Sequence, residues 1–182
     1  MNRTAVAISA LLLSLCAMPA SAADLGIDSI SIEGGYSPND NGDVSMGRVG
    51  VQWDWGVKWL EMGNWYLGGY WDLSAGYWNS NQSDIGDFGI TPVFRFQSAT
   101  TSGFSPYIEI GVGAHVLTET SITTNRQFST NFQFGDHVGA GFRFGDKGEY
   151  DLAYHLQHLS NASIDTPNPG INFHQIRFQY HF

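Results

Sequence analysis

The sequence predicts an all-β protein, an eight-stranded antiparallel transmembrane β-barrel. Apolar and polar residues alternate with a period of two in about eight segments, which turn-rich stretches separate. In each segment one face is large and aromatic, while the other carries glycine, glutamine and most of the charged residues. Tryptophan and tyrosine gather near the segment ends, where the aromatic girdles of membrane barrels lie. This pattern favours strands with lipid on one side and a polar interior on the other.

The predicted strands follow one another along the chain with turn-forming loops between them. In the second strand, for example, Val49 and Val51 face one way while Arg48 faces the other. Loops are predicted at 37–43, 79–83 and 118–130, and a local bulge is predicted at Pro92 because proline lacks an amide donor. Asp136 interrupts the apolar face of the sixth strand, which the pattern does not explain. The strands are expected at residues 26–36, 48–55, 65–77, 87–96, 107–116, 132–144, 149–160 and 172–182.

The face opposite the aromatic one holds charges of both signs. A soluble domain would not place such charges in its interior, whereas a membrane barrel does. We expect a salt-bridged plug and no pore, because side chains can just fill an eight-stranded barrel. Inward histidines are expected to join this network and not to bind a metal. The interior charges are Arg48, Arg95, Arg143, Arg177, Asp54, Asp72, Asp87 and Glu109, and the histidines are His115, His137, His155 and His181.

Residues 1–22 are predicted to be a cleaved signal peptide, and residues 23–182 the barrel domain. Arg3 supplies the positive end, residues 5–17 are apolar, and residues 20–22 form an A-x-A cleavage site. The apolar stretch is well short of the about 20 residues that a transmembrane helix needs. The single cysteine, Cys16, lies in the segment to be removed, which excludes disulfides and thiolate chemistry from the mature chain. The net charge of −9 argues against a nucleic-acid partner.

Reactive side chains lie together at the hairpin between the last two predicted strands. His158 and Ser160 share a face, and alternation from Leu152 places them on the outer wall together with Asn172. With both termini in the periplasm, this hairpin is extracellular and the three residues lie at the level of the outer leaflet. A hydroxyl, a base and an orienting group in one patch are typical of nucleophilic catalysis. Alternatively, they only mark the water interface, where polar side chains return.

This stretch resembles the signature of the outer-membrane lipid A 3-O-deacylases (PagL-type), His-x-Ser-Asn followed by Pro-Asn and Gly-x-Glu. The likeness extends over nearly all of the mature chain, and the last strand ends in Phe182 as bacterial outer-membrane barrels do. The signature positions read His158-Leu-Ser160-Asn161, Pro167-Asn168 and Gly170-Ile-Asn172.

The resemblance implies a serine esterase of the bacterial outer membrane. Ser160 would attack the 3-position ester of lipid A, and His158 would take its proton. Asn168 and the backbone amide of Ser163, where the family usually has glycine, would stabilise the oxyanion, with Asn161 also in the substrate-facing set. No metal or cofactor is implied. The partners are lipid A or lipopolysaccharide as substrate and the surrounding outer-membrane lipids, while the oligomeric state, including a homodimer, stays open.

The chain departs from the family at the third member of the triad, where glutamate is replaced by Asn172. Asparagine can hold an imidazole in the right tautomer, but it cannot stabilise imidazolium as a carboxylate does. In a serine protease the corresponding change lowers turnover about 10⁴-fold. Asp165 in the loop is the alternative source of charge.

Two other functions compete with the esterase. One is a small non-enzymatic structural or adhesive barrel whose extracellular loops bind partners. The other is a barrel acyltransferase, which needs an interior channel for its donor chain that the charged interior opposes.

Overall fold

The computed structural model describes residues 26–38, 44–100 and 102–182. The predicted signal peptide lies outside the described residues, as does most of the loop predicted at 37–43. Within the described part of the chain, no helix is long and apolar enough to cross a membrane. The strands are β1 (Ser29–Ser37), β2 (Val44–Asp54), β3 (Trp59–Met62), β4 (Trp65–Asn79), β5 (Asp84–Ser98), β6 (Ser105–Leu117), β7 (Ser121–Thr123), β8 (Arg126–Gln127), β9 (Phe132–Phe144), β10 (Tyr150–Ser160) and β11 (Ile171–His181).

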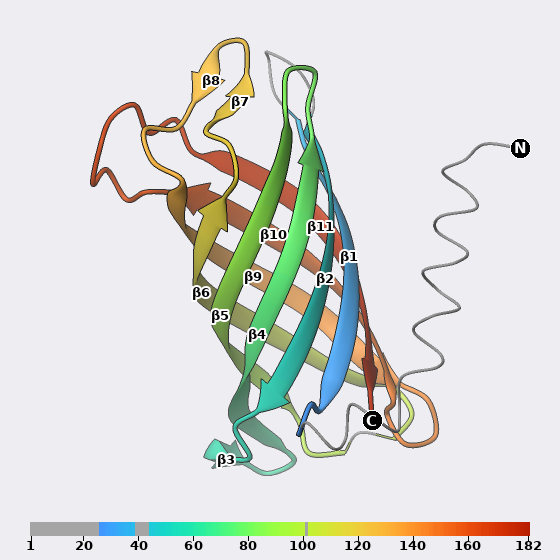
Figure 1. Ribbon diagram of the computed structural model, residues 1–182. Helices are drawn as coiled ribbons and strands as arrows, with labels where there is room; N and C mark the ends of the chain where they lie inside the picture. The colour runs from blue at the N-terminus through green and yellow to red at the C-terminus, as the bar shows by residue number, and fades with distance from the viewer. Residues whose placement is uncertain (1–25, 39–43, 101) are drawn as a thin grey trace, which may run out of the picture.

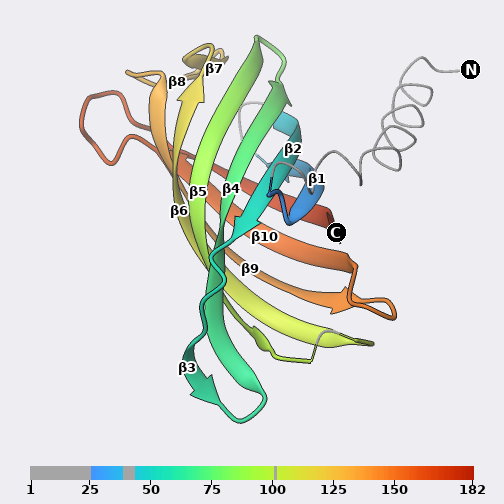
Figure 2. The same ribbon diagram turned by 60° about the horizontal axis from the view of Figure 1, so that its bottom comes forward.

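Eight of these strands close into an antiparallel barrel, which confirms the predicted fold (Figure 1). The hydrogen-bonded order is β2-β1-β11-β10-β9-β6-β5-β4, and β4 pairs with β2 to complete the ring. β1 and β11 lie side by side, with Ser29 opposite His181. β3 extends the sheet beyond the end that holds the C-terminus, as Figure 2 shows. We call the opposite end, where residues 80–83 and 161–170 connect strands, the distal end.

The two faces of the barrel wall divide as the alternation predicts. On β6, Ile108, Ile110 and Val112 are 57–61% exposed on the outside, although they are fully apolar. Their inward neighbours Glu109 and His115 are buried. An exposed apolar belt of this size suits contact with lipid and not with water.

The middle of the barrel holds the expected salt-bridged plug. Arg95 Nε lies 2.7 Å from Glu109 Oε2, and Arg95 Nη1 lies 2.9 Å from Asp151 Oδ2. Arg177 Nη2 lies 2.8 Å from the other oxygen of Glu109. All four side chains are at most 5% exposed, so these buried charges are compensated by direct partners.

The interior at the distal end is apolar, which the sequence did not predict. There the Trp78 and Phe173 rings pack with centroids 5.0 Å apart. Ile122 and Phe128, from the segment predicted to be a plain loop, are also buried in this cluster. Ile122 lies in β7, which pairs with β8, and Phe128 follows β8 directly. The loop prediction was wrong because two isolated apolar residues in a Thr- and Asn-rich stretch give no periodic signal. The cluster, which we call the distal core, comprises Val44, Met46, Trp78, Ile85, Leu117, Ile122, Phe128, Leu159, Ile171 and Phe173.

The bulge predicted at Pro92 is also wrong. Pro92 is opposite Trp71 in an uninterrupted register between β4 and β5. On the other side, the ladder to β6 omits Thr91 and Pro92 and resumes with Val93 in the same register. Pro92 lacks an amide donor, so the pairing between β5 and β6 is lost locally. No extra residue is inserted, so there is no bulge.

Candidate active site

The last hairpin of the barrel joins His158 directly to Asn172. The two residues are opposite each other on β10 and β11, both on the outer wall. His158 Nδ1 lies 2.6 Å from Asn172 Oδ1. An amide oxygen can only accept a hydrogen bond, so the imidazole carries its proton on Nδ1. Its Nε2 atom is then an acceptor, the state that a general base requires.

Ser160 ends β10 two residues beyond His158 and lies on the same face. The two backbone positions are about 7 Å apart along the strand, a distance that the two side chains can span. Both side chains are half-buried, and in the described part of the chain no hydrogen bond joins them. Such bonds often tighten only when substrate is bound. The geometry thus places the Ser160 hydroxyl, the His158 imidazole and the Asn172 amide on the same face of the wall at the rim.

Gly170 packs the connecting loop against the imidazole. A Cβ atom at this position would lie 2.7 Å from His158 Cε1, and the residue has a φ of +61°. Both the close contact and the left-handed backbone favour glycine at this position. The loop therefore closes over one face of His158 and restricts its ring.

The loop between β10 and β11 contains the two amide groups that the resemblance assigns to the oxyanion, on Asn168 and Ser163. Asn168 Oδ1 accepts a hydrogen bond from the Asn161 backbone N–H at 3.1 Å, which leaves the Asn168 NH₂ group for another partner. Ala162 and Ser163 have φ values of 53° and 61°, the left-handed region. Ser163 thus adopts the conformation that favours glycine, at the position where the resemblance expects glycine.

Asn161, which the resemblance places with the oxyanion and substrate residues, has a buried side chain. It is 1% exposed, and its Nδ2 donates to Ser129 Oγ at 2.8 Å and to the Asp165 carbonyl oxygen at 3.0 Å. Its side chain ties the loop to the segment that precedes β9. Its part in the substrate site stays a prediction.

Asp165, predicted as a substitute for the missing glutamate, is directed elsewhere. Its carboxylate accepts the Thr166 backbone N–H at 2.8 Å, and the residue is exposed. Among the described residues, the hydrogen-bond partner of His158 is Asn172 and not Asp165.

A carboxylate that sequence reasoning did not connect to the site lies on the other side of His158. Asp136 on β9 is directly opposite His158, and both lie on the outer wall. Directly opposite residues have Cβ atoms about 4.5–5.5 Å apart. His158 is therefore flanked by Asn172 on β11 and by Asp136 on β9. The sequence feature that could have pointed to Asp136 is its charge, which interrupts the apolar face of this strand.

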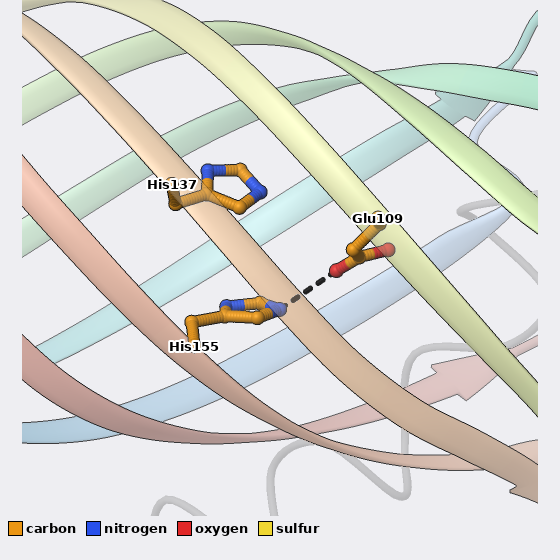
Figure 3. A group of neighbouring side chains, drawn as sticks. All are labelled: Glu109, His137 and His155. Atoms are coloured by element: carbon orange, nitrogen blue, oxygen red, sulfur yellow. Dashed lines mark hydrogen bonds and ion pairs between the residues drawn. The ribbon is translucent and has the colours of Figure 1, made fainter.

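A second group of ionisable side chains lies inside the barrel, away from the rim (Figure 3). Ligand-type atoms of Glu109, His137 and His155 lie within 4.8 Å of one another. His155 bonds Glu109 through Nε2 at 2.7 Å and Glu33 through Nδ1 at 2.9 Å, while Arg95 also binds Glu109. A cation here would have to displace these bonds beside a guanidinium. The donor set therefore fits the ion-pair network better than a metal site.

Comparisons with known proteins place this geometry in context. The family model described as "Lipid A 3-O-deacylase (PagL)" matches residues 45–181. The chain is 30% identical over 134 residues to the lipid A deacylase PagL of Pseudomonas aeruginosa, covering 72% of this chain and 75% of that protein. It is 36% identical over 115 residues to the lipid A deacylase PagL of Bordetella bronchiseptica, covering 61% of each. The crystal structure of the outer membrane enzyme PagL is similar, with a TM-score of 0.74, 26% identity, and 85% and 99% of the two chains covered.

Proposed function

We propose that this chain, which belongs to the lipid A 3-O-deacylase (PagL) family, hydrolyses the 3-O-linked acyl ester of lipid A by serine catalysis. As a member of that family, it is an enzyme of the outer membrane that deacylates lipid A. The observation that carries the proposed mechanism is the 2.6 Å bond between His158 Nδ1 and Asn172, because it leaves Nε2 as the acceptor of a residue that shares its strand face with Ser160.

The proposed reaction proceeds through an acyl-enzyme. His158 Nε2 takes the proton of Ser160 as the serine oxygen attacks the ester carbonyl, and the C=O becomes an oxyanion. The NH₂ group of Asn168 and the backbone N–H of Ser163 donate to that oxyanion. The intermediate then collapses, the bond to the sugar oxygen breaks, and His158 returns the proton to that oxygen. Water attacks the acyl-enzyme by the same sequence and releases a hydroxy fatty acid.

The position of the residues on the barrel fits a substrate that is embedded in the membrane. His158 and Ser160 lie on the outer wall, above an apolar belt that contacts lipid. We propose that the distal end faces the cell exterior, so that the ester reaches Ser160 sideways from the outer leaflet. We also propose that residues 1–22 direct export and are removed, so that the mature protein begins at Ala23.

We assign the missing charge of the triad to Asp136. The imidazolium that forms when His158 takes the serine proton needs a nearby negative charge, which Asn172 does not have. Asp136 is opposite His158 on the adjacent strand and at the edge of a low-dielectric region, where a charge interaction is stronger than in water. In this assignment Asn172 fixes the tautomer of the His158 imidazole, and Asp136 stabilises the imidazolium that forms from it.

Mass spectrometry of lipid A tests the proposal. Cells that express the native chain should lose one 3-hydroxyacyl group per lipid A, and cells with Ser160→Ala should not. Equal amounts of folded barrel in the membrane serve as the control. Loss of a different acyl chain would contradict the 3-O position, and loss in the Ser160→Ala cells would contradict the nucleophile. Unchanged lipid A in both cultures would favour a non-enzymatic barrel.

A further inference from the structure

A groove at the distal end adjoins the loop that holds the proposed oxyanion donors. It has a volume of about 330 Å³ and lies between the β7–β8 hairpin and the segment around Asn168. Its lining includes Thr123, Asn125 and Arg126 on one side and Pro167 and Pro169 on the other. We propose that this groove binds the phosphorylated sugar headgroup of the lipid substrate, with Arg126 contacting a phosphate. The inference rests on the proposed function, because it adds a subsite to the same reaction.

Arg126 is placed for an anionic ligand. Within the described chain it is the one basic side chain in a distal loop. The ion pairs among described residues do not include it, so its guanidinium is available. The fork of guanidinium donors matches phosphate oxygens. The other basic residues that the structure describes lie inside the barrel or towards the end that holds the C-terminus: Arg48, Arg95 and Arg177 in the first group, and Lys58, Arg143 and Lys147 in the second.

A second, independent observation also indicates a ligand. Thr123 is 3% exposed, and its hydroxyl has no hydrogen-bond partner in the described structure. Buried hydroxyl groups are normally satisfied by protein, water or ligand. Thr123 is among the residues that line the groove, so a phosphate or sugar hydroxyl seated there would lie beside this residue.

The groove is held in a fixed relation to the catalytic loop. The Ser129 backbone N–H donates to the Pro167 carbonyl oxygen at 3.0 Å, and the Ser129 hydroxyl accepts from Asn161. Pro167 and Pro169 border both the groove and Asn168. A lipid whose phosphate binds Arg126 would therefore have its sugar ring, and the esters on that ring, positioned near Ser160.

Binding by the inactive variant tests the groove apart from turnover. Ser160→Ala is titrated with detergent micelles that contain either phosphorylated lipid A or lipid A dephosphorylated enzymatically. Adding Arg126→Gln should weaken binding of the phosphorylated lipid about tenfold, the loss expected for one charge-assisted contact, and should leave the dephosphorylated lipid unchanged. Arg126→Lys should retain most of the binding. Lys147→Gln removes the same charge at the other end of the barrel and should have no effect.

The outcomes separate the two proposals. Equal weakening for both lipids, or no weakening with either, overturns the groove even if the native chain releases acyl groups normally. A phosphate-dependent effect of Arg126→Gln supports the groove even if the native chain releases no acyl group, in which case only the proposed reaction fails. Thr123→Val provides a second variant inside the groove and should weaken the same phosphorylated lipid.

Discussion

Replacing Asp136 by asparagine tests whether the charge beside His158 is part of the catalytic machinery. The substitution keeps the size and shape of the side chain and removes its charge. Asp136 lies on β9 opposite His158, while Asn172 holds the same imidazole from β11. Because the two neighbours lie on different strands, each can be changed without moving the other.

The expected magnitude follows from the cross-strand spacing. Opposite Cβ atoms about 5 Å apart place the carboxylate roughly 6 Å from the imidazole. At an effective dielectric constant of about 20, a unit charge at that distance stabilises imidazolium by about 3 kcal/mol, or about 100-fold in rate. Solvent at the exposed carboxylate reduces the effect, so we expect kcat to fall roughly 10- to 100-fold, with KM little changed.

The assay compares Asp136→Asn in two backgrounds, using purified protein and lipid A in detergent micelles. In the native background the full loss is expected. In the Asn172→Glu background a carboxylate already contacts the ring, so Asp136→Asn should cost less than about threefold. Asp165→Asn removes a loop carboxylate whose hydrogen-bond partner, among the described residues, is the Thr166 backbone, and it is the matched control. An equal loss in both backgrounds would show a structural role, and no loss in either would refute the assignment.

Three further predictions concern the loop and the barrel interior. Gly170→Ala should lower kcat at least tenfold while the barrel remains folded, because the new methyl group meets His158 at 2.7 Å; activity at the native level would show that the ring is free to move. Ser163→Gly should relieve left-handed strain and stabilise the loop by about 1 kcal/mol without loss of activity, measured by proteolysis of the loop; faster cleavage would contradict this. Glu109→Gln should destabilise the barrel by about 3–5 kcal/mol, because Arg95 and Arg177 lose their shared partner, as measured by urea unfolding in detergent; an unchanged midpoint would show that other interior groups compensate.

The inward or outward direction of the wall side chains was predictable because each strand shows it in its own alternation of apolar and polar residues. Lipid outside and buried charges inside impose the same period-two pattern wherever a strand crosses, so the direction of Ile108 or Glu109 needs no knowledge of its neighbours. The contact between His158 and Asn172 was predictable for a similar reason, since one hairpin joins their strands. The catalytic roles of His158, Ser160 and Asn172 remain predictions.

Contacts that depend on the offset between neighbouring strands, or on how a loop packs, were not predictable. Asp136 and His158 are opposite each other only because the turn between β9 and β10 fixes their register, and the sequence pattern gives neither the turn length nor the offset. Ile122 and Phe128 join the distal core from a segment without periodicity. Asn161 looked like part of the reactive signature, but its burial depends on a contact with Ser129 far away in the sequence.

The candidate site is completed only when the first barrel strand, β1, pairs with the last, β11. Asn172 belongs to β11, whose other edge pairs with β1 from the opposite end of the chain. Until β1 and β11 pair, one edge of β11 is open to pairing with other chains, and Asn172, the residue that contacts His158, is held only by β10. A barrel that stalls before closure is therefore both aggregation-prone and poorly organised at the rim. Hydrolytic activity would report completed membrane insertion.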